Sequence, residues 1–66
     1  MKSMYDVQQR LRDFGLFVYT GDRLGDLELI RLELDDLYRH NLLPLKEYAT
    51  IKSIIKREIR LMKHKS

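Results

Sequence analysis

Residues 34–55 of this 66-residue chain, LDDLYRHNLLPLKEYATIKSII, contain two helical apolar patterns separated by a tight turn. The first pattern belongs to a helix predicted over residues 26–39, and the second to a longer helix predicted over residues 44–63. Asn41 suits the left-handed conformation that often ends a helix. Pro44 suits the first turn of the next helix, because its missing N–H is not needed there. The stretch therefore predicts a helical hairpin.

A third helix is predicted over residues 4–14. Ser3 can cap its start, and Asp6 three residues later fits a capping box. Gly15 stands where a left-handed residue is expected at its end, and Asp26 is predicted to cap the second helix. The apolar positions that recur on one face of the first helix are Met4, Val7, Leu11 and Phe14. Three amphipathic faces predict one all-α domain over the whole chain, a small three-helix bundle.

The stretch GLFVYTG, residues 15–21, has the composition of a β-strand but no partner strand in the chain. We expect it to be a loop in which Leu16, Phe17 and Tyr19 fold back and cap the open end of the bundle. Burial of one such side chain contributes roughly 1.5–3 kcal/mol. Two alternatives remain at this point: a docking surface for a partner, or a strand that pairs in a dimer.

The composition excludes several classes of protein. With no cysteine the chain forms no disulfide, and a zinc site would lack its commonest sulfur ligands. A hydrophobic fraction of 44% is too high for a disordered chain. No apolar run reaches the roughly 18 residues that a membrane span needs, and the N-terminus lacks the apolar segment of a signal peptide. We therefore expect a cytoplasmic protein with no membrane contact.

No residue set specifies a reaction. His40 and His64, the only histidines, lie on different helices, so no metal or cofactor is expected. Asp35 and Asp36 are adjacent and point about 100° apart on a helix, which does not suit a shared-proton pair. The serines and threonines have no base nearby in sequence, and so short a bundle offers no obvious enclosed pocket. The sequence predicts a protein that is not an enzyme and has no small-molecule substrate.

The basic residues are concentrated in the last third of the chain. Residues 1–43 carry six Lys/Arg and eight Asp/Glu, whereas residues 44–66 carry seven Lys/Arg and two Asp/Glu. A basic stripe about 16 Å long, from the helical rise per residue, follows one edge of the last helix. Its members are Lys52, Lys56, Arg57, Arg60 and Lys63. Such a stripe predicts contacts to phosphates without a sequence code.

Single-stranded nucleic acid is the favoured partner, because exposed aromatic rings can stack on its bases. Tyr48 at the start of the stripe, or Tyr19 in the loop, is the predicted stacking residue. Three alternatives stay open for the stripe. Its charges could be solvated, could pair with the acidic face of residues 26–39, or could bind an acidic protein.

A different function is predicted by apolar residues that lie off the main helical stripes. They are Leu29, Leu32, Ile54 and Leu61. If exposed together, they form the kind of patch that marks an interface. This alternative is a protein–protein adaptor that self-associates as a symmetric homodimer.

Residues 5–48 resemble the YqgQ-like family of small bacterial proteins. The most specific parts are YDVQQ at residues 5–9, FVYTG at residues 17–21 and DLEL at residues 26–29. The resemblance implies a three-helix bundle. It also implies a role in binding single-stranded nucleic acid, which has been suggested for this family without an established activity. Residues 34–55 are also similar to helix-turn-helix hairpins appended to many bacterial proteins, which supports the hairpin.

Overall fold

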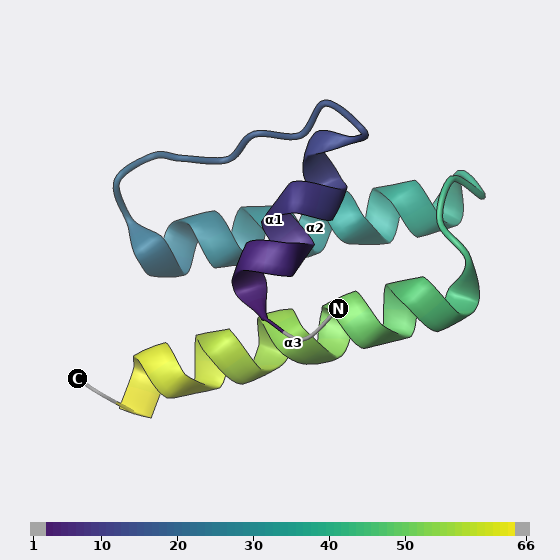
Figure 1. Cartoon of the computed structure of the whole chain (residues 1–66). Helices are drawn as coiled ribbons and strands as arrows, with labels where there is room; N and C mark the ends of the chain where they lie inside the picture. The colour runs from purple at the N-terminus through teal and green to yellow at the C-terminus, as the bar shows by residue number, and fades with distance from the viewer. Residues whose placement is uncertain (1–2, 65–66) are drawn as a thin grey trace.

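The computed structural model describes residues 3–64, which form three helices and no strand. Helix α1 spans Met4–Arg12, α2 spans Arg23–Arg39 and α3 spans Leu45–His64. Figure 1 shows α2 and α3 running antiparallel, joined by a short turn, with α1 lying across the pair. The predicted all-α three-helix bundle is confirmed.

The core lies where the apolar faces of the three helices meet. Val7 of α1, Leu27 and Leu34 of α2, and Ile51 and Ile55 of α3 are fully buried. The other buried apolar residues are Met4, Leu11, Ile30 and Leu43. These positions follow the helical spacing of the sequence, so local pattern and tertiary packing agree.

Both predicted left-handed helix ends are present. Gly15 has φ 78° and Asn41 has φ 59°. After α1, the Leu16 N–H donates to the Leu11 carbonyl and the Gly15 N–H donates to the Arg12 carbonyl. This is the double hydrogen-bond pattern of a Schellman motif. Because the tightened turn begins here, α1 ends at Arg12 and not at the predicted residue 14.

The predicted N-cap of the second helix is wrong. Helix α2 begins at Arg23, with Asp22 at the cap position, and the Asp26 N–H donates to the Asp22 carbonyl inside the first turn. Asp26 is only 6% exposed. Its Oδ1 accepts the Thr20 N–H at 2.9 Å and the Thr20 hydroxyl at 2.6 Å. Because Gly25 continues the helix and does not delay its start, Asp26 lies inside α2 and not at its cap. From there its side chain fastens the preceding loop to the helix.

The prediction that residues 15–21 cap the open end of the bundle is half wrong. The segment Leu16–Thr20 runs extended along α2 (Figure 1). Leu16 and Val18 pack against the core, as predicted for Leu16, but Phe17 is 71% exposed and Tyr19 is 90% exposed. An extended backbone points successive side chains in opposite directions, so only every second residue can face the core. The two aromatic rings therefore lie outside.

Candidate nucleic-acid interface

The last three turns of α3 and the facing side of α2 border a basic groove. Its walls are formed by Glu28, Arg31, Lys56, Ile59, Arg60, Lys63 and His64. We call these residues the basic groove. Among residues 3–64, four Lys/Arg side chains and one histidine line the groove with one carboxylate, which gives it a positive potential. The groove brings together Lys56, Arg60 and Lys63 of the predicted stripe.

Arg31 was missed by the sequence reasoning. It follows Leu27 by one helical turn and precedes Leu34 by three positions, so it borders the buried stripe of α2 on the side of α3. Its Nε is buried and has no hydrogen-bond partner among the described residues. The helical spacing from Leu27 and Leu34 is the sequence signal that places Arg31 beside the core, although its helix is otherwise mostly acidic.

Arg57 lies beside this groove and not in it. It lines a shallow hollow on the outer side of α3, which Lys56 and Arg60 border as well. Within the described residues, none of Lys56, Arg57 and Arg60 has a carboxylate oxygen within the 4.0 Å of an ion pair. Lys56 and Arg60 therefore connect two positively charged surfaces.

Lys52, the first residue of the predicted stripe, lines the same hollow as Arg57 but is paired with a carboxylate of α2. Its Nζ lies 2.8 Å from the Tyr48 hydroxyl and 3.2 Å from Asp35 Oδ1 on α2. These hydrogen bonds raise the pKa of Lys52. The hydrogen bond from Tyr48, followed by that from Lys52, lowers the pKa of Asp35. Pairing with the acidic helix, one of the open alternatives, thus holds for this lysine.

Tyr48, the predicted stacking residue, lines the hollow with Arg57, and both its ring and its hydroxyl have partners within the protein. Its ring stacks on Tyr38 with 4.2 Å between centroids and 11° between planes. Its hydroxyl donates to Asp35 at 2.7 Å, and the Lys52 ammonium lies over the ring. Tyr19 is exposed but lines a different groove. The basic groove therefore has no tyrosine of its own.

The two acidic residues of α3 are both paired with arginines of other helices. Glu47 accepts two hydrogen bonds from Arg10 of α1, at 2.7 and 3.1 Å, in a fork geometry. This contact lowers the pKa of Glu47. Glu58, which lies within the basic stripe, pairs with Arg23 of α2 at 3.5 Å. These pairings fasten α1 and α2 to α3 and partly offset the negative charges of Glu47 and Glu58.

The apolar patch predicted as an alternative interface is exposed at three of its four positions. Leu29, Leu32 and Leu61 are exposed, but Ile54 packs against the core.

Every helix within residues 3–64 is too short or too polar to span a membrane. The same residues include no group of three His, Cys, Asp or Glu side chains that could hold a metal ion.

Comparison with known proteins matches nearly the whole chain. Residues 1–61 match the sequence model of the family described as YqgQ-like. The chain is also 34% identical over 64 residues to "Uncharacterized protein YqgQ" of Bacillus subtilis (strain 168). That alignment covers 97% of this chain and 90% of the relative.

Proposed function

The chain belongs to the YqgQ-like family, and we propose that it is a non-enzymatic protein that binds single-stranded nucleic acid through the basic groove. The observation that carries the proposal is the convergence of Arg31, Lys56, Arg60 and Lys63 from two helices on one groove, which among residues 3–64 is lined by a single carboxylate. Arginine and lysine side chains in this arrangement suit the phosphates of a polyanion. The absence of cysteine agrees with a cytoplasmic site of action.

The form of the surface favours a single strand over a duplex. Its central residues, Lys56 and Arg60, border both the groove and the neighbouring hollow with Arg57. A flexible strand can bend from one surface into the other and place successive phosphates near these cations. A duplex presents its phosphates on a stiff cylinder and reaches fewer of them.

The mode of binding predicts a measurable salt dependence. If about three or four phosphates are neutralised, the affinity for a single strand falls about 20- to 50-fold between 50 and 200 mM salt. Fluorescence anisotropy with a labelled oligonucleotide of about 12 nucleotides measures this slope, at a length that small single-strand-binding domains cover. The duplex of the same sequence is expected to bind more weakly.

A matched pair of variants tests the location. Lys56→Glu with Arg60→Glu removes the central cations and is expected to abolish binding at low salt. Arg39→Glu with Lys46→Glu makes the same change of charge, from +3 to −1, at exposed positions near the turn between α2 and α3. This control is expected to retain most of the affinity. Equal losses in both variants, or no binding by the unaltered protein at low salt, would refute the proposal.

A further inference from the structure

The extended segment Leu16–Thr20 has one backbone edge that is bonded to its own domain. At one end the Leu16 N–H donates to the Leu11 carbonyl at 3.1 Å, and at the other the Thr20 N–H donates to Asp26 Oδ1 at 2.9 Å. Between these anchors, within residues 3–64, no hydrogen bond reaches the backbone of Phe17, Val18 or Tyr19.

The unbonded groups of Phe17 and Tyr19 fall on the opposite edge. In an extended strand, the N–H and C=O of one residue point to the same edge, and those of the next residue point to the other. The bonded N–H groups of Leu16 and Thr20 therefore place the N–H and C=O of Phe17 and Tyr19 on the edge away from α2. An exposed edge of this kind pairs readily with another strand.

We propose that this edge is a dimer interface, in which the segment pairs antiparallel with the same segment of a second copy around a two-fold axis at Val18. In this register Phe17 of one copy lies opposite Tyr19 of the other. Both residues then exchange N–H and C=O groups with their counterparts, which gives four hydrogen bonds across the axis. The interface uses the groups that each copy leaves unbonded.

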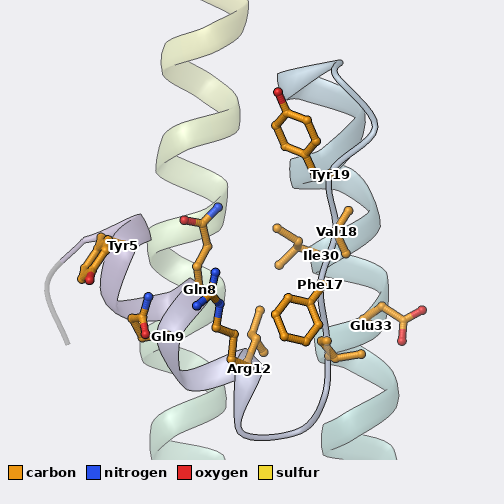
Figure 2. A pocket seen from close by; sticks show the side chains of 11 residues that line it. Tyr5, Gln8, Gln9, Arg12, Phe17, Val18, Tyr19, Ile30 and Glu33 are labelled. Carbon is orange, nitrogen blue, oxygen red and sulfur yellow. The ribbon is translucent and has the colours of Figure 1, made fainter.

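The side chains fit a second copy as well as the backbone does. The same register forms two cross-strand pairs of Phe17 with Tyr19, a combination that stabilises antiparallel strands. Figure 2 shows both rings on the side of the segment that faces α1, above a groove whose lining includes Leu11 and Ile30. The dimer would cover two rings that are otherwise 71% and 90% exposed.

The self-complementary register favours a second copy over an unrelated peptide. A two-fold contact brings each residue opposite one at an equal distance from the axis. Only an axis at Val18 places Phe17 and Tyr19, the two aromatic residues with outward N–H groups, opposite each other. The interface shares no residue with the basic groove, so dimer formation can be tested independently of nucleic-acid binding.

Cysteine cross-linking tests the register, because the chain has no cysteine of its own. The axis places the two copies of residue 18 in a non-hydrogen-bonded pair, with Cα atoms about 4.5 Å apart, which a disulfide can span. Val18→Cys is therefore expected to form a covalent dimer under mild oxidation. Leu29→Cys, on the exposed face of α2, is the control and is expected to stay mostly monomeric.

Sedimentation tests the backbone contribution. Tyr19→Pro removes one outward N–H and is expected to shift the protein to monomer, whereas Tyr19→Phe keeps both the N–H and a ring and is expected to remain dimeric. Circular dichroism checks that each variant keeps its helices. A purely monomeric unaltered protein at about 1 mM, a concentration that detects even weak association, would overturn the proposal. So would cross-linking through Leu29→Cys in preference to Val18→Cys.

Discussion

The contact between Asp26 and Thr20 makes a sharp prediction about stability. Asp26 is a buried carboxylate that accepts two hydrogen bonds from the loop, at 2.9 and 2.6 Å. Hydrogen bonds to charged groups contribute about 1.5–3 kcal/mol each. Thr20 itself is exposed, and in the variant its donors can bond to water, so we expect Asp26→Ala to cost about 2–4 kcal/mol of unfolding free energy.

Such a loss is large for a domain of this size. Folded domains have total stabilities of about 5–15 kcal/mol, and small ones lie at the low end. One kcal/mol moves the melting temperature of a domain of this size by about 4–8 °C. Thermal and urea unfolding followed by circular dichroism are therefore expected to show a large shift for Asp26→Ala and a smaller one for Thr20→Val.

Asp22→Ala is the matched control for this prediction. Asp22 is an exposed acid at the cap position of the same helix, and its side chain makes no capping hydrogen bond. We expect its removal to cost at most about 0.5 kcal/mol, as for ordinary surface substitutions. Equal destabilisation by Asp22→Ala and Asp26→Ala would refute the view that Asp26 fastens the loop to α2.

Three further predictions follow from the packing and the ion pairs. Leu34→Ala, at a fully buried position, should cost about 2–5 kcal/mol of unfolding free energy. Leu32→Ala, at a position that is 55% exposed, should cost little. Similar urea midpoints for the two variants would contradict this prediction. Hydrogen bonds from Tyr48 and from a guanidinium lower the pKa of Asp35 and Glu47 respectively. The two ionised carboxylates therefore stabilise the folded protein above their unfolded pKa values, and this stabilisation is lost as pH falls through the folded pKa values. We expect Asp35→Asn with Glu47→Gln to weaken the dependence of the melting temperature on pH below about pH 4. Tyr48→Phe should lower stability but leave oligonucleotide affinity unchanged; a large loss of affinity would return Tyr48 to the binding site.

The helices could be predicted because each one carries its own periodic signal. Leu27, Leu34, Ile51 and Ile55 recur at helical spacing, and burial follows directly from that pattern. Asn41 marks a helix end through its own conformational preference. Local chemistry is enough for these features.

The outcome for the loop and the stripe depended on tertiary contacts that the helical periodicity does not contain. Phe17 and Tyr19 face outward because Leu16 and Val18 take the positions against the core, and the Thr20–Asp26 contact fastens the end of this extended segment. Lys52 is paired within the protein because Asp35 lies opposite it on α2. Side-chain pairing across helices decides which charges remain available, and residue type alone does not specify it.

The central claim concerns where nucleic acid binds, and an NMR titration of the 15N-labelled protein tests it most directly. On addition of a single-stranded oligonucleotide at low salt, we predict that the amide signals of residues 56–63 and of Arg31 shift together. The signals of residues 39–46, near the turn between α2 and α3, should stay in place. Shifts confined to α1 and residues 16–20, or no shifts at all, would contradict the account.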